Sequence, residues 1–120
     1  MKTQNGVKWP KPKKLIKLPL YGRRSLALYT NQKAYTQAIK NRNDEKVDLT
    51  DVGGRVTMCP DDDGYMLYVV GWFAGSVGSL VHELMHVGFF VFESAGLDPK
   101  DSDGEALCYY VQYLVDELLD

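Results

Sequence analysis

The sequence predicts an α+β domain in which helices pack on a small, mostly antiparallel sheet. Short segments with strand composition occupy much of the first 70 residues, a strongly apolar segment of helical length follows, and the last segment carries apolar residues at helical spacing. The chain has 120 residues, of which 45% are hydrophobic. This is enough for one compact domain with a small core.

Residues 1–14 are expected to form a basic, partly extended arm that precedes a single domain over residues 15–120. The arm holds two of the five prolines and few apolar residues. Its lysines predict a solvated segment; an arm that contacts phosphates or an acidic partner is the alternative. The formal net charge of the whole chain is −2, which argues against nucleic-acid binding.

Two short strands, over residues 15–18 and 25–29, are separated by Pro19 and Gly22. Thr30 or Asn31 can then cap a helix through residues 32–39. Two further strands, over residues 55–59 and 65–70, are expected to pair as a hairpin. Its turn contains three aspartates, which we interpret as a solvated turn and not as a metal site.

Two helices complete the predicted fold. The first runs from about Ser79 to Ala95 and ends at Gly96 and Pro99. The second is capped by Ser102 or Asp103 and runs to about residue 119.

The sequence also bears on cellular location. The first residues lead into lysines and prolines and not into an apolar run, so no secretory signal is predicted. The longest apolar stretches are too short to span a bilayer. Cys59 and Cys108 lack CxxC spacing and are interpreted as reduced thiols. Together these features predict a cytoplasmic protein without a membrane partner.

The segment His82-Glu83-Leu84-Met85-His86 matches the HExxH pattern and contains both histidines of the chain. Residues four apart lie nearly one above the other on a helix, about 6 Å apart along its axis, so both imidazoles can bind one ion. Glu83 is turned by about 100° and is placed to reach a water molecule on that ion. The alternative is a pair of hydrogen-bonded core histidines beside a glutamate in a salt bridge.

Zinc requires a third protein ligand, and no histidine remains to supply it. Glu105 is the best candidate, because it lies in the first turn of the next predicted helix, which can fold back beside the first. Glu93 is about 10 Å beyond His86 along the helix, too far for the same ion. Asp101 and Asp103 remain open as ligands, although they suit capping or turn roles better.

The HExxH motif followed by Gly104-Glu105-Ala106-Leu107 resembles the gluzincin group of zincin metallopeptidases, and especially the very small HExxH proteins of bacteriophages and prophages. The resemblance covers about residues 75–119 and rests on the motif. It implies a zincin-like domain in which His82, His86 and Glu105 bind Zn²⁺ and Glu83 is the general base. Tyr109 stands where the group often has an aspartate, and no oxyanion-stabilising residue is identifiable. Tyr109 and Tyr113 are candidates for a second-shell or oxyanion role.

Two functions follow from these observations. The first is a zinc-dependent metallopeptidase that acts on a peptide or protein, with residues 65–70 as an edge strand to which an extended peptide is added. The second is a non-enzymatic, phage-type binding or assembly protein in which zinc is structural. A phage-encoded protein would work in the host cytoplasm. A nucleic-acid-binding role for the basic arm is a weaker third hypothesis.

Overall fold

The computed structural model describes residues 3–4, 7–19, 23–43, 46–47, 53–60 and 64–120, and confirms the predicted α+β class. Four strands form a mixed sheet in the order β3-β4-β6-β5: β3 (Lys14–Lys17), β4 (Arg24–Tyr29), β5 (Gly54–Pro60) and β6 (Met66–Trp72). The outer pairs β3/β4 and β5/β6 are antiparallel, and the central pair β4/β6 is parallel. Strands β1 (Thr3–Gln4) and β2 (Val7–Lys8) form a separate antiparallel pair.

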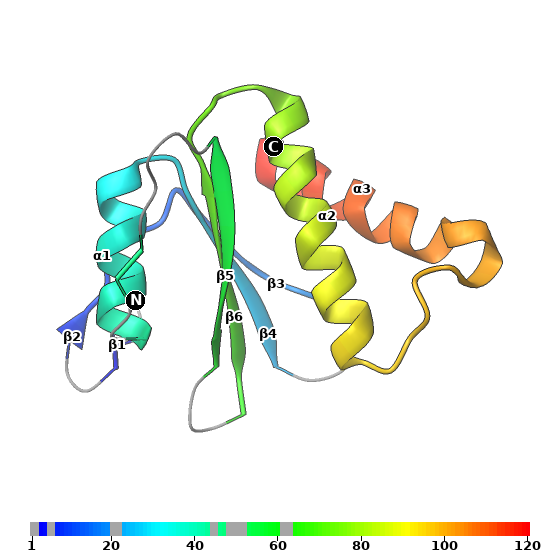
Figure 1. The fold of residues 1–120 in the computed structure, drawn as a ribbon, viewed down its shortest axis with the longest axis horizontal. Helices are drawn as coiled ribbons and strands as arrows, with labels where there is room; N and C mark the ends of the chain where they lie inside the picture. The colour runs from blue at the N-terminus through cyan, green and yellow to red at the C-terminus, as the bar shows by residue number, and fades with distance from the viewer. Residues whose placement is uncertain (1–2, 5–6, 20–22, 44–45, 48–52, 61–63) are drawn as a thin grey trace.

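Helices cover both faces of the four-stranded sheet (Figure 1). Helix α1 (Gln32–Asn43) lies on one face, while α2 (Val77–Ser94) and α3 (Glu105–Leu119) lie on the other. Side chains alternate along a strand, so each face has its own core. The core under α2 and α3 contains Leu26, Leu28, Tyr68, Val70, Leu80, Leu84, Val87, Val91, Leu114 and further apolar residues. The core under α1 contains Trp9, Ala27, Tyr29, Tyr35, Ala38, Ile39, Val47, Cys59, Leu67 and Val69.

The predicted hairpin is present, but the expected edge strand was wrong. Strand β6 lies inside the sheet, between β4 and β5, so its backbone groups are already paired. Among the described residues, β5 forms the edge on this side of the sheet. The physical reason is the parallel pairing of β6 with β4, a contact between segments far apart in the sequence.

Local capping hydrogen bonds explain where some of the helices begin. Asn31 caps α1 as predicted, because its Oδ1 accepts a hydrogen bond from the Ala34 backbone N–H at 3.0 Å. Ser76 caps α2 in the same way, so this helix begins at Val77, two residues earlier than expected. The predicted cap of α3 was wrong: Ser102 and Asp103 have positive φ angles in a short 3₁₀ turn, and Gly104 occupies the cap position.

The end of the predicted arm packs on the domain. The Trp9 side chain is 3% exposed, and the Tyr29 hydroxyl donates a hydrogen bond to the Pro10 carbonyl oxygen at 2.6 Å. The Lys14 ammonium group donates to the Asp120 carbonyl oxygen at 2.7 Å, and so ties β3 to the end of α3. Across the described ranges, no helix is both long enough and apolar enough to cross a membrane.

Candidate metal centre

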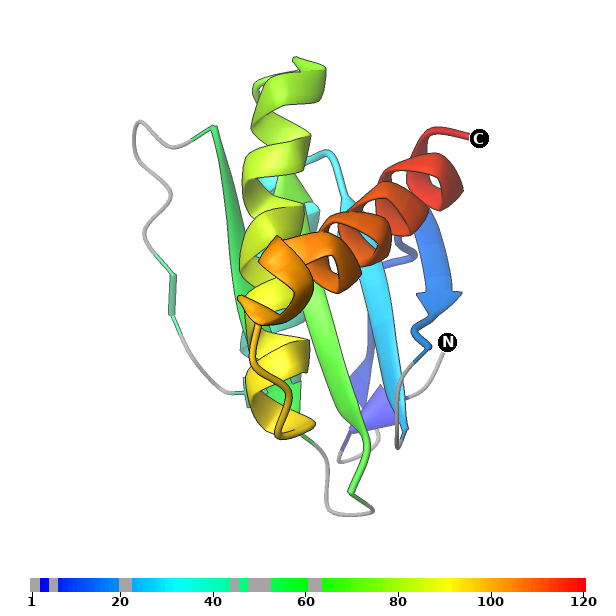
Figure 2. The ribbon, with the colours of Figure 1, turned by 90° about the vertical axis from the view of Figure 1, so that its right-hand side faces the viewer.

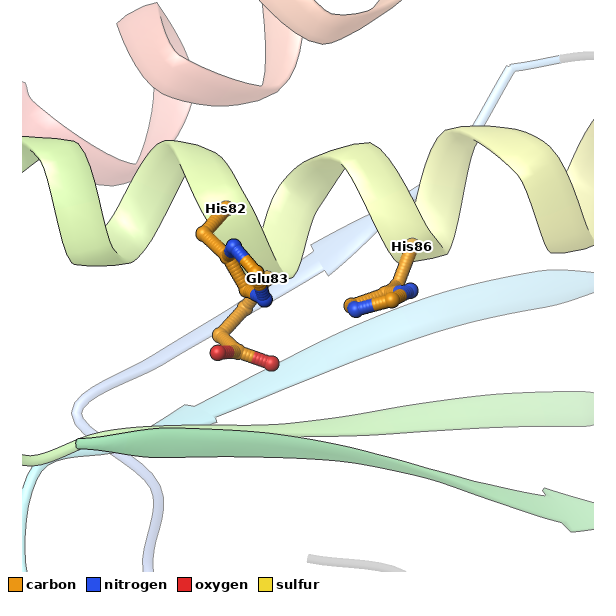
Figure 3. A group of neighbouring side chains, drawn as sticks. All are labelled: His82, Glu83 and His86. Atoms are coloured by element: carbon orange, nitrogen blue, oxygen red, sulfur yellow. The ribbon is translucent and has the colours of Figure 1, made fainter. Parts of the chain in front are cut away.

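The three polar residues of the HExxH motif lie together on α2. His82 and His86 are exposed and Glu83 is buried, and one ligand atom from each lies within 4.8 Å of the others. Figure 3 shows both imidazoles and the carboxylate on the same side of the helix, between α2 and the sheet. The donor set is two imidazole nitrogens and one carboxylate oxygen, which suits a divalent transition-metal ion. The structure is therefore compatible with a metal site here.

The two imidazole rings are close but not stacked. Their centroids are 5.1 Å apart and their planes are inclined by 77°. One turn further on, the Phe90 ring lies nearly parallel to the His86 ring, with centroids 6.3 Å apart and planes inclined by 22°. Phe90 therefore forms an apolar wall beside His86, on the side towards the end of α2.

The Glu83 side chain is seated against the backbone of β5. A Cβ atom added to Gly54 would lie 2.9 Å from Glu83 Cγ and 3.0 Å from Glu83 Oε2, so the carboxylate occupies space that only glycine leaves open. Glu83 is 7% exposed, and its side chain makes no hydrogen bond or ion pair with any residue that the structure describes. Glu83 also lines the cavity beside the imidazoles, so a cation bound there would be within reach of its carboxylate.

A cavity of about 340 Å³ opens between α2 and the edge strand β5. It places the histidines and Glu83 beside a stretch of strand backbone and an aromatic side chain. Its lining residues are Gly54, Arg55, Val56, His82, Glu83, His86 and Phe90. Ligand-binding clefts commonly measure about 300–1,000 Å³, so a segment of a larger molecule can enter.

Among the described residues β5 is an edge strand, and it borders this cavity. The Phe73 backbone N–H donates to the Gly53 carbonyl oxygen at 2.9 Å, so residues 53 and 73 form a hydrogen-bonded pair. Such pairs alternate with non-hydrogen-bonded ones in an antiparallel ladder. The register Gly54↔Trp72 therefore directs the backbone N–H and C=O groups of Gly54, Val56 and Met58 away from β6.

The structure does not bring Glu105 to the histidines. Glu105 is exposed at the start of α3 and is absent from the metal-compatible group found among the described residues. Helix α3 packs against α2 at Gly88, where an added Cβ would meet Leu107 Cδ1 at 2.8 Å. Gly88 is two residues after His86, about 200° round the helix. Figure 2 shows α3 crossing over α2 towards β4 and β3, away from β5.

The tyrosines proposed for a second-shell or oxyanion role also lie on α3. Tyr109 is 66% exposed and Tyr113 is 39% exposed, and neither lines the cavity beside the histidines. Their roles, like the ligand role of Glu105, stay predictions from the motif. The lining residues that sequence reasoning missed are Gly54, Arg55, Val56 and Phe90. The signal for Gly54 was its place beside Gly53 at the start of a strand, where glycine often marks a close backbone approach.

No protein-family model matches this chain, and neither a curated protein nor a solved structure matches it. The chemistry of the site is therefore inferred from its own residues.

Proposed function

We propose that this chain is a zinc-dependent hydrolase of peptide bonds, built on the gluzincin plan, in which His82 and His86 bind zinc and Glu83 is the general base. One observation carries the proposal. The Glu83 carboxylate, which makes no hydrogen bond or ion pair with any described residue, lies within 4.8 Å of two imidazole ligand atoms, beside a cavity lined by β5.

The residues present fit zinc. Ligands at about 2.0–2.1 Å in tetrahedral geometry are separated by roughly 3.3 Å. The ligand atoms of His82 and His86 lie within 4.8 Å of each other and of a Glu83 carboxylate oxygen, so small rotations of the two exposed imidazoles can bring both to one ion while the carboxylate stays beside it. Imidazole and carboxylate are both common zinc ligands, and a site with few protein ligands leaves positions for water or substrate. When bound, zinc polarises a carbonyl oxygen and lowers the pKa of a water molecule to about 7.

Glu83 supplies the proton-transfer step. Its carboxylate accepts a proton from the attacking water and then delivers that proton to the nitrogen of the leaving amine. The close seat against Gly54 limits the rotamers of Glu83, which keeps its carboxylate beside the imidazoles. A general base with few accessible conformations loses little entropy when it reaches the reactive geometry.

An extended peptide can bind by pairing with the edge of β5 as an added strand. Gly54 and Val56 direct backbone N–H and C=O groups towards this edge, and a peptide that pairs with them becomes a fifth strand; the Met58 carbonyl oxygen already accepts a hydrogen bond from Asn43 Nδ2 at 3.4 Å. Gly54 and Val56 also line the cavity that holds His82 and His86. A peptide bound there therefore passes directly beside the proposed metal ligands.

The decisive experiment compares the zinc content and the peptide-library cleavage of Glu83→Gln with those of the unchanged protein. The substitution removes the base but keeps the size of the side chain, so we expect bound zinc without cleavage. Glu93→Gln is the matched control, because Glu93 is an exposed glutamate on the same helix and outside the metal-compatible group. Cleavage at the unchanged rate by Glu83→Gln would rule out this mechanism.

A second function, a non-enzymatic phage-type binding or assembly protein with a structural zinc, is favoured by one specific observation. Glu83 is the only carboxylate in the metal-compatible group of the described residues, so it suits the role of third ligand as well as that of base. In that case Glu83→Gln should weaken zinc binding sharply, and the unchanged protein should cleave no peptide. The same two measurements thus separate the two functions.

A further inference from the structure

We propose that the cavity beside the histidines selects peptides with an apolar side chain, which it holds against Phe90 of α2 and Val56 of β5. This inference rests on the proposed function and names the class of peptide that the same site accepts. Both residues line the cavity of about 340 Å³ that also contains His82, Glu83 and His86. Both are half-buried and pack against the apolar core under α2 and α3.

The Val56 side chain lies on the face of the sheet that α2 covers. Its neighbour Thr57 lies on the other face, because the Thr57 hydroxyl shares a hydrogen bond of 2.6 Å with the Tyr35 hydroxyl of α1. Side chains alternate along a strand, so Arg55 is on the α1 face together with Thr57. Although Arg55 also lines the cavity, its side chain starts from the opposite face of the sheet. Val56 is therefore the apolar side chain that β5 contributes to the cavity.

Phe90 extends the row of proposed metal-site residues along α2. It is four residues after His86, so the two rings lie one above the other on the helix, with centroids 6.3 Å apart and planes inclined by 22°. The protein buries Phe90 only in part, and the residue lines the cavity. An apolar side chain bound here would remove exposed surface of Phe90 and Val56 from water, which favours binding.

A peptide that pairs with the edge of β5 brings a side chain to this position. Val56 directs its backbone N–H and C=O groups away from β6, so a peptide residue can pair directly opposite it. Residues directly opposite each other project their side chains from the same face of a sheet, so this side chain points towards α2. The peptide residue opposite Gly54, beside Glu83, is two positions away. The selected apolar residue therefore lies two positions from the residue at the proposed metal.

The two walls distinguish apolar side chains from charged ones. Neither a valine nor a phenylalanine side chain donates or accepts a hydrogen bond, so a carboxylate or an ammonium group placed against them loses hydration without gaining a partner. A leucine side chain loses only apolar contact with water. One methylene group more or less in an apolar pocket changes selectivity about tenfold or more, and because both walls are only half-buried we expect about tenfold for the whole side chain.

The test uses capped octapeptides that share one threonine-rich host sequence and carry Leu, Ala, Asp or Lys at a single varied position. Calorimetry measures their affinities for the metal-free full chain, and mass spectrometry measures their cleavage by the zinc-loaded chain. We expect the Leu peptide to bind about tenfold more tightly than the Asp peptide, and to be cleaved about tenfold faster at low concentration. The metal-free measurement reports on the apolar walls alone, because it requires no catalysis.

Two variants and a matched control assign the preference to these walls. Phe90→Ala removes one wall and should reduce the preference for the Leu peptide to about threefold or less. Val56→Thr keeps the shape of the side chain but adds a hydroxyl group, and should halve the preference or reduce it further. Phe89→Ala is the control, because Phe89 is 45% exposed on the same helix and does not line the cavity. It should leave the preference unchanged.

The two measurements separate failure of this inference from failure of the proposed function. Cleavage without a preference for the Leu peptide would overturn the inference and leave hydrolysis intact. A preference in the metal-free chain, without cleavage by the zinc-loaded chain, would support the inference and contradict hydrolysis. Absence of both binding and cleavage would contradict both. An equal loss of preference in Phe89→Ala would also overturn the inference, as would an unchanged preference in Val56→Thr, even if Phe90→Ala fails to fold.

Discussion

Substitution of Gly54 by alanine tests the contact on which the candidate site depends. The new Cβ would lie 2.7 Å from the Gly71 carbonyl oxygen, 2.9 Å from Glu83 Cγ and 3.0 Å from Glu83 Oε2. Real Cβ contacts shorter than 3.0 Å essentially do not occur, so some atoms must move. The Gly71 oxygen belongs to the backbone of the central strand β6 and has little room to shift. Overpacking of this kind costs about 1–3 kcal/mol in the free energy of unfolding.

Urea denaturation measures this cost through the transition midpoint, at an unchanged dependence on denaturant. Gly78→Ala is the matched control, because a Cβ at Gly78 meets nothing within 4 Å. Since alanine favours helix, we expect this control to be neutral or to stabilise by up to about 1 kcal/mol. A Gly54→Ala variant with wild-type stability would refute the close contact between the Glu83 side chain and β5.

A double-mutant cycle divides the cost between the two neighbours of Gly54. Glu83→Ala removes two of the three short contacts and leaves the contact with the Gly71 oxygen. If Glu83 is seated as described, Gly54→Ala should cost less in the Glu83→Ala background, by at least about 0.5 kcal/mol. Equal costs in the two backgrounds would show that the carboxylate lies elsewhere.

Three further predictions concern pH, packing and metal. Burial raises the pKa of Tyr35 to about 12 from its usual 10, so its stabilising contribution is complete below pH 10 and is lost as pH rises towards 12. Urea denaturation should show an alkaline loss of stability, to which Tyr29 and Tyr110 also contribute because burial raises the pKa of both. About 2–3 kcal/mol of this loss should disappear in Tyr35→Phe, and an unchanged loss in that variant would contradict the prediction. Gly88→Ala should change stability by less than about 1 kcal/mol in the same assay, because the Leu107 side chain that it meets can rotate, and a cost equal to that of Gly54→Ala would contradict this. Zinc at 100 times its Kd should stabilise the protein by about 2.7 kcal/mol in calorimetry, and a similar gain in His86→Ala would exclude His86 as a ligand.

The secondary structure was predictable because it depends on local patterns. A strongly apolar segment of helical length predicted α2, and apolar residues at helical spacing predicted α3. A local hydrogen bond to Asn31 starts α1 where the sequence indicated. The order of strands was not predictable from the same patterns, because the parallel pairing of β4 with β6 joins distant segments. One signal was available: Met66–Trp72 is almost continuously apolar, as in strands buried on both faces, whereas β5 carries Arg55 and Thr57.

The same distinction between local and distant contacts applies to the residues of the candidate site. His82, Glu83 and His86 share one helix, so helical geometry alone predicts that they converge. A ligand from α3 requires in addition that α3 dock on the histidine side of α2. The side of α2 on which α3 packs depends on Gly88, because the missing side chain there leaves room for Leu107 and Val111. It also depends on the apolar surface that α3 shares with β3 and β4.

The histidine side of α2 is therefore bordered by the edge strand and not by another helix. On one side of the helix lie Leu84, Val87 and Val91 in the core, and on a second lies α3 at Gly88. The third side carries the exposed imidazoles, which face β5 across the cavity. Under the proposed function, an edge strand contributes backbone groups that bind an extended chain, and water or the bound peptide can approach the metal beside His82 and His86. This arrangement favours a site that is completed by its substrate over one that is closed by the fold.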